Sequence, residues 1–235
     1  GMCCRIIMGH CRLDLQGQIF LKVMKHKEYV VLVSDALTAH ADPKRALEMK
    51  AYLRHQFEFL GIQTPTRRSI FKVLPKLPKD AALILQIANE LWKKPEREFR
   101  YVACDLLSQN AQVFGLGDLP AIKKLLQQDS WWETVDSLSG AIGDIVLKEK
   151  INHLNSQAIM DEWLQDSDFW VRRSAMIHQL GWKAQTDQER LSKYALALSG
   201  ESEFFIRKAI GWAFRDYARQ DPVFVKSLSL IHISE

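Results

Sequence analysis

Hydrophobic residues recur along this chain at the three- and four-residue spacing of amphipathic helices, and no alternating run of the kind typical of half-buried strands is found. Proline follows a capping residue at Asp42-Pro43, Thr64-Pro65 and Asp221-Pro222, as is common where helices begin. The pattern predicts about a dozen helices of roughly 10–18 residues, joined by short loops.

One predicted helix begins at Ser130 and has two different faces. Ser130 and Glu133 have the spacing of a capping box, which favours a helix start at this point. The core-facing stripe of the helix comprises Trp131, Val135, Leu138, Ile142, Ile145 and Val146. On the flank of that stripe lie Trp132, Asp136, Gly143 and Gly140. A large ring, a lone carboxylate and two residues without side chains make a surface that something else can approach closely.

A repeat underlies the helical pattern. Four predicted helices start with an aromatic residue or pair, at Glu98-Phe99, Trp131-Trp132, Phe169-Trp170 and Phe204-Phe205. The second residues of these pairs are 33, 38 and 35 positions apart. All-helical repeats of this length predict stacked helix pairs of the HEAT or armadillo sort, whose second helices commonly line the concave side. We therefore expect an all-α fold, a curved solenoid of HEAT-like repeats.

The predicted helix from residue 202 to about residue 219 carries a basic stripe. Its apolar side comprises Ile206, Ile210, Ala213, Phe214 and Tyr217. Nearly opposite lie Lys208, Trp212, Arg215 and Arg219. Cations that neutralise phosphates around a ring that packs on sugar or base suit a nucleic-acid surface. Alternatively, Trp212 packs on the neighbouring repeat and the cations form a solvated face.

Two charged residues, Arg173 and Asp136, occupy unusual positions on their predicted helices. Arg173 falls inside the apolar sector of its predicted helix, where an unpaired guanidinium is costly. It could pair with Asp136 or Glu133, or hold a phosphate through two hydrogen bonds. Asp136 is either a surface aspartate that pairs with an arginine of the next repeat or a catalytic carboxylate.

Composition describes an ordinary globular chain: 235 residues, 47% hydrophobic and 26% charged, with a net charge of +4. No apolar run approaches the roughly 20 residues needed to span a bilayer, so we expect a cytoplasmic protein. Cys3, Cys4 and Cys11 have a spacing that no common zinc motif uses, and we expect no metal or other cofactor. Nucleophile triads and phosphate-binding glycine loops are also absent from the sequence. Any chemistry must rest on one carboxylate, positioned rings and cations.

At these residues the chain resembles the AlkD-like DNA alkylation repair glycosylases of bacteria. The matching segments are residues 59–65 with Arg67-Arg68, Leu91-Trp92 with residues 95–99, and residues 130–137 and 203–212. The resemblance runs from about Tyr29 to about Lys226, so we expect residues 29–235 to form the repeat domain and residues 1–28 an N-terminal extension.

The resemblance implies an enzyme that cups duplex DNA on a basic concave face and removes cationic N3- and N7-alkylated purines, without a tight pocket for a flipped base. By motif, Asp136 resembles the catalytic carboxylate and Arg173 the residue that holds the nearby backbone. The residues similar to those that contact the lesion-bearing nucleotide or lie near the DNA are Trp132, Trp212, Tyr52 and Gln63.

The sequence thus predicts a monomeric, monofunctional DNA glycosylase that binds DNA through Lys208, Arg215 and Arg219 as well. The main alternative is a non-catalytic HEAT-like module that binds damaged or branched DNA. A helical-repeat adaptor for other proteins is a third possibility, which an apolar concave face would favour.

Overall fold

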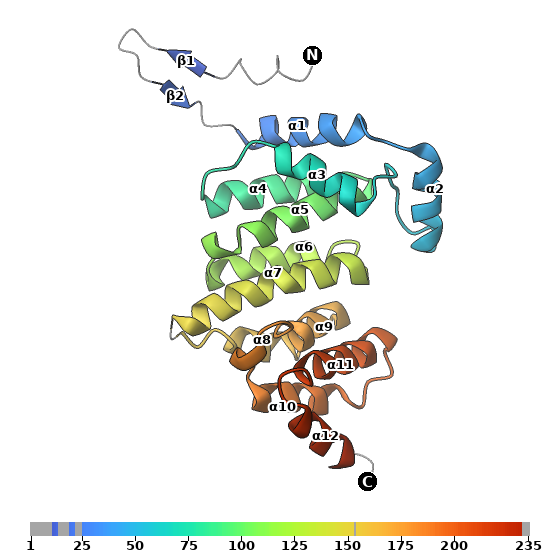
Figure 1. Cartoon of the computed structure of the whole chain (residues 1–235), viewed down its shortest axis with the longest axis vertical. Helices are drawn as coiled ribbons and strands as arrows, with labels where there is room; N and C mark the ends of the chain where they lie inside the picture. The colour runs from blue at the N-terminus through green and yellow to red at the C-terminus, as the bar shows by residue number, and fades with distance from the viewer. Residues whose placement is uncertain (1–10, 14–18, 22–24, 153, 232–235) are drawn as a thin grey trace.

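A computed structural model describes residues 11–13, 19–21, 25–152 and 154–231, and those residues form twelve α-helices and one small sheet (Figure 1). The helices are α1 (His26–Thr38), α2 (Pro43–Tyr52), α3 (Thr64–Val73), α4 (Ala81–Trp92), α5 (Arg97–Gln109), α6 (Leu119–Leu126), α7 (Trp132–Ile151), α8 (Ala158–Trp163), α9 (Phe169–Ile177), α10 (Gln188–Leu198), α11 (Phe204–Tyr217) and α12 (Pro222–Ile231). The prediction of an all-helical solenoid is confirmed for the body of the protein.

Two short strands near the N-terminus were not predicted. β1 (Cys11–Leu13) pairs with β2 (Ile19–Leu21) as an antiparallel hairpin, with Arg12 opposite Phe20. Both strands belong to the segment that we expected to be an extension, and Figure 1 shows them beside α1, away from the stacked helices.

The helices stack as antiparallel pairs in two rows. Within pairs, α4 packs on α5, α6 on α7, α8 on α9 and α10 on α11. Between pairs, α5 packs on α7, α7 on α9 and α9 on α11, so the second helices form one continuous row (Figure 1). None of the helices in the described part of the chain is both long and apolar enough to cross a membrane.

The aromatic repeat marks the first turn of each helix in that second row. Phe99, Trp132, Trp170 and Phe205 lie near the starts of α5, α7, α9 and α11. Three neighbouring repeats are joined by ring contacts, because the Trp131 ring lies 6.0 Å from Trp170 and 5.2 Å from Phe205, centroid to centroid. Edge-on contacts of this kind add to the free energy gained by burial of the rings. These ring contacts therefore stabilise the stacking of α7, α9 and α11 at the N-terminal ends of the three helices.

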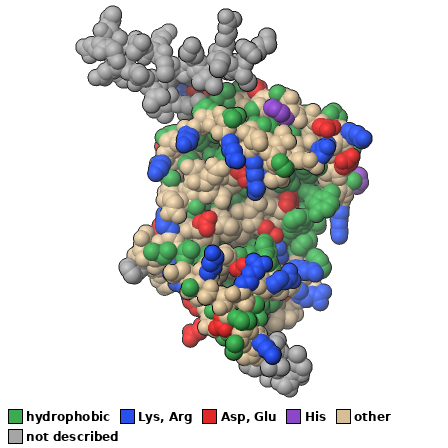
Figure 2. All heavy atoms as spheres, viewed as in Figure 1, with side chains coloured by type: hydrophobic (Ala, Val, Ile, Leu, Met, Phe, Trp, Pro, Cys, Tyr) green, Lys and Arg blue, Asp and Glu red, His purple; other side chains and the backbone are tan. Residues whose placement is uncertain are grey.

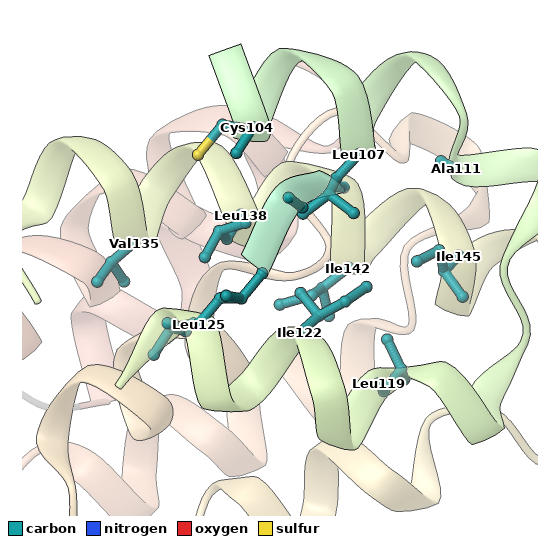
Figure 3. Close-up of a cluster of buried hydrophobic side chains, with 14 of the residues drawn as sticks. Cys104, Leu107, Ala111, Leu119, Ile122, Leu125, Val135, Leu138, Ile142 and Ile145 are labelled. Atoms are coloured by element: carbon teal, nitrogen blue, oxygen red, sulfur yellow. The ribbon is translucent and has the colours of Figure 1, made fainter. Parts of the chain in front are cut away.

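The core lies between the two rows, and Figure 3 shows one part of it where α5, α6 and α7 meet. Residues from the three helices that point toward one another there are Cys104, Leu107, Leu119, Ile122, Leu125, Val135, Leu138, Ile142 and Ile145. Except for Cys104, which is 3% exposed, these residues are completely shielded from solvent. The stripe predicted for α7 is thus in the core, except that Trp131 at its start is only partly buried.

The capping box predicted at the start of α7 is wrong. The Ser130 hydroxyl donates to the Leu126 carbonyl, and Trp131 is the N-cap without a capping side chain. The Glu133 carboxylate instead accepts hydrogen bonds from Arg97 and Tyr101 of α5. A charged partner on the neighbouring repeat binds this carboxylate more strongly than one backbone N–H would. The expected cap at Asp42, by contrast, is confirmed, because its carboxylate accepts from the Arg45 N–H.

Helix α9 ends against the glycine face of α7. A methyl group on Gly143 would lie 2.2 Å from the carbonyl oxygen of His178, whereas one on Gly140 would meet nothing within 4 Å. The close approach predicted for this face therefore occurs at Gly143, and what approaches is the next repeat.

Candidate functional site

Asp136 and Arg173 form a two-pronged ion pair across adjacent helices of the second row. Arg173 Nε and Nη2 each donate to one oxygen of the Asp136 carboxylate at 2.8 Å. Arg173 Nη1 also donates to the Phe205 carbonyl, at 2.5 Å, in the first turn of α11. One guanidinium thereby joins α7, α9 and α11, and it fixes the direction in which the carboxylate points.

Burial makes this carboxylate unusual. The side chain of Asp136 is 16% exposed and that of Arg173 is 6% exposed. Burial raises the pKa of Asp136 above its ordinary value, while the hydrogen bonds and the charge of Arg173 act in the opposite direction. Of the partners considered for Arg173, the structure selects Asp136. Glu133 is bound to Arg97 instead.

Three other residues singled out in the sequence meet at one pocket. Tyr52 at the end of α2, Gln63 at the N-cap of α3 and Trp132 at the start of α7 all line a pocket of about 490 Å³. Gln63 is exposed and its side chain makes no capping hydrogen bond, and Tyr52 is 75% exposed. These residues are up to 80 positions apart in the chain, and the fold brings them together.

The inner wall of this pocket is a set of polar groups that sequence reasoning missed. Arg67 lies over the Tyr101 ring at 5.0 Å and pairs with Asp105 at 3.2 Å. Tyr101 donates to Glu133, which is held by the buried Arg97. Arg67 could have been suspected, because it falls on the buried side of the amphipathic α3 together with Ile70 and Phe71.

The predicted basic stripe faces solvent, although α11 ends at Tyr217 and Arg219 lies in the turn that follows. Ile206 and Ala213 are buried, while Trp212 remains 39% exposed. All three predicted DNA-binding cations are exposed, and none of them forms an ion pair within the described residues: Lys208, Arg215 and Arg219. Figure 2 shows Lys and Arg side chains gathered over α11, with further ones beside α2 and hydrophobic side chains between the two groups.

The candidate residues thus fall into three adjacent groups. Asp136 and Arg173 are in direct contact, whereas Trp132 begins the same helix as Asp136 and lines the pocket. Trp212 lies on α11, which packs on the helix that carries Arg173. The contacts place these groups along consecutive helices of one row, with Tyr52 and Gln63 at its N-terminal end.

No group of three or more His, Cys, Asp and Glu residues is arranged to hold a metal ion in the described part of the chain. Cys3 and Cys4 lie outside that part, and only the backbone of Cys11 is described.

Comparison with known proteins decides the family. A family described as DNA alkylation repair enzymes matches residues 33–228. The chain belongs to this family. A protein from Enterococcus faecalis, described as a predicted DNA alkylation repair enzyme, is 36% identical with a TM-score of 0.71, over 80% of this chain and 88% of its own.

Two further solved structures share the fold. AlkD2 from Streptococcus mutans is 20% identical, with a TM-score of 0.52 over 77% of this chain and 87% of its own. The protein smu.31 from Streptococcus mutans is 19% identical, with a TM-score of 0.54 over 84% of this chain and 87% of its own. No curated protein sequence matches the chain. The match of residues 33–228 to the family of DNA alkylation repair enzymes makes DNA alkylation repair the function class of this family member.

Proposed function

We propose that this protein is a monofunctional DNA glycosylase that excises cationic N3- and N7-alkylated purines from duplex DNA. The observation that carries the proposal is the Asp136 carboxylate, held in one orientation by Arg173 and still partly exposed. We propose residues 29–235 as the repeat domain that does this, acting as a cytoplasmic monomer without a cofactor.

The chemistry requires little more than a positioned negative charge. Alkylation at N3 or N7 gives the purine a positive charge, so the electrons of the glycosidic bond neutralise the base as it leaves. The sugar becomes an oxocarbenium-like cation, which an aspartate close to C1′ stabilises electrostatically. Asp136 then orients a water whose oxygen bonds to C1′, and the carboxylate or solvent takes the released proton.

The surrounding residues have supporting roles in this proposal. The faces of Trp132 and Trp212 favour the positive charge of the lesion-bearing nucleotide through cation–π attraction. Arg173 positions the carboxylate, and its N–H groups that are not bonded to Asp136 or Phe205 donate to backbone phosphate near the lesion. Phosphates further along the duplex are neutralised by Lys208, Arg215 and Arg219, and the DNA near the pocket contacts Tyr52 and Gln63.

The alternative function is a module that binds damaged or branched DNA without cleaving it. A carboxylate near phosphates weakens DNA binding through charge repulsion, so DNA binding gives no reason for Asp136 beyond its structural ion pair with Arg173. A protein adaptor is disfavoured by the exposed cations of α11.

The test is release of free methylated base from methylated duplex DNA by the wild type, Asp136→Asn and Asp144→Asn. Asp144 is an exposed carboxylate on the same helix, two turns beyond Asp136, and provides the matched control. We expect release by the wild type and by Asp144→Asn, and none above background from Asp136→Asn, which should bind DNA as well as the wild type or more tightly. No release from any of the three, with DNA binding retained, would establish the binding module instead.

A further inference from the structure

The pocket between α2, α3, α5 and α7 shares Trp132, Tyr52 and Gln63 with the proposed DNA interface, but the proposed catalytic carboxylate does not line it. Its lining includes Trp132 and Ser137 from α7, yet Asp136, which lies between them in the chain, is not part of that lining. Cleavage at Asp136 would therefore occur beside this pocket and not within it. Its volume of about 490 Å³ falls in the range of roughly 300–1,000 Å³ that is typical of small-molecule sites.

Six of the fourteen residues that line the pocket are aromatic or apolar, and the other eight are polar or charged. The aromatic and apolar residues are Met49, Tyr52, Leu53, Phe59, Tyr101 and Trp132. Stacking on aromatic rings stabilises any of the nucleobases, because every base has a π-face.

Two polar atoms in residues of the same wall lack partners among the described residues. Arg67 is 6% exposed, and its Nε has no hydrogen-bond acceptor. Oε2 of Glu133 has no donor, although Oε1 accepts from both Arg97 and Tyr101. A buried donor or acceptor without a partner costs free energy, which a ligand able to bond to it would recover. Both atoms are buried within the wall, so a ligand in the pocket bonds to them only after the Arg67 or Glu133 side chain shifts.

We propose that this pocket binds a nucleobase other than the one whose glycosidic bond is cleaved. The edge of a nucleobase carries both donors and acceptors, so it complements the exposed amide of Gln63, and also Arg67 and Glu133 once their side chains shift, while its face packs on the rings. Arg68, exposed at the same pocket, is placed to bind an attached phosphate. The base comes either from an intact nucleotide displaced from the duplex near the lesion or from free base in solution. The first of these sources, a nucleotide displaced from the duplex, rests on the proposed function.

The test uses a variant that fills the pocket and a control on the same helix. Met49→Trp places an indole in the pocket wall, whereas Leu47→Trp places one at a position that is 69% exposed and outside the pocket. Thermal unfolding followed by circular dichroism establishes that both variants fold.

The first arm irradiates protein bound to a duplex with 5-iodouracil opposite a tetrahydrofuran abasic analogue, and maps the crosslinks by mass spectrometry. The second arm measures saturation transfer by NMR from the protein to adenine and to adenosine 5′-monophosphate. We expect crosslinks at Met49 or Tyr101 in the wild type, lost at Tyr101 in Met49→Trp and kept in Leu47→Trp. Transfer to adenine that Met49→Trp abolishes, without such crosslinks, would identify free base as the source.

If the wild type gives neither crosslinks in the pocket nor saturation transfer to adenine or adenosine 5′-monophosphate, the pocket does not bind a nucleobase and the proposal is overturned. Base release from methylated duplex DNA, measured with the same protein preparations, separates this failure from failure of the proposed function. Release without pocket occupancy rejects only the pocket, whereas pocket occupancy without release keeps the pocket and rejects the glycosylase.

Discussion

Arg173 of α9 holds both oxygens of Asp136 on α7 at 2.8 Å, so the proposed catalytic carboxylate is positioned by the next repeat of the solenoid. A buried pair of this kind is costly to break, at roughly 3–5 kcal/mol when one partner is removed. The stacking of α7 on α9 and the direction of the carboxylate therefore depend on the same contact.

Replacing Arg173 should change the pH dependence of base release. In Arg173→Gln, burial still raises the pKa of Asp136, but the hydrogen bonds and charge that lower it are removed. Protonation then begins at a higher pH, so the acidic limb of the pH–rate profile should move upward. The measurement is release of methylated base between about pH 4 and 8. An acidic limb at the wild-type position would show that Arg173 does not control this carboxylate.

Trp212→Ala should weaken engagement of the damaged nucleotide. Loss of one ring that stacks on a nucleotide costs about 1–3 kcal/mol, or roughly 5- to 160-fold in base-release efficiency. The control is Leu196→Ala, which removes an exposed apolar side chain from α10 in the other row. Single-turnover kinetics on the same methylated duplex compare the two, and equal rates for Trp212→Ala and wild type would count against contact with the lesion.

The cations in and directly after α11 should contribute to DNA affinity through phosphates. Substitution of Lys208, Arg215 or Arg219 by Ala should lower the slope of log affinity against log salt by about 1 for each phosphate that is no longer neutralised. Lys93→Ala, at the exposed end of α4, should leave the slope unchanged. Fluorescence anisotropy at several salt concentrations measures these slopes. Equal slopes for all four variants would place the DNA elsewhere.

Gly143→Ala should destabilise the fold, because its new methyl group would meet the His178 carbonyl at 2.2 Å. We expect a loss of about 1–3 kcal/mol, typical of overpacking in a tightly packed interior. Gly140→Ala on the same helix has open space and should gain about 0.5–1 kcal/mol from helix propensity. Urea unfolding measures both, and equal effects on the free energy of unfolding would contradict the close packing of α7 on α9.

Stability should fall in mild acid because of His178. Burial lowers the pKa of this ring to about 4, with Arg190 also lowering it and Asp161 and Asp187 acting to raise it. The unfolded chain binds a proton at this residue below about pH 6.5 and the folded chain only near pH 4. The free energy of unfolding should thus drop between these values, by up to about 3 kcal/mol. His178→Gln should flatten the pH dependence in this window. An unchanged slope would show that His178 is not its origin.

The sequence determined those features that depend on short spacings. Helical periodicity and the 33-, 38- and 35-residue spacing of aromatic residues predicted stacked helix pairs, because each helix must bury one face against its neighbours. The buried stripe of α7 and the exposed Trp212 followed from positions on single helices. Whether Asp136 or Glu133 binds Arg173, however, depended on how neighbouring helices align, and periodicity leaves that open.

Tertiary structure alone decided which partners are chosen and where the pocket lies. The Glu133 carboxylate binds Arg97 and does not form the predicted helix cap, and the end of α9 packs against Gly143. The pocket joins α2 and α3 to α5 and α7, so no local pattern encodes it. A side chain binds the strongest partner within reach, and that reach is set by the packing of helices distant in sequence.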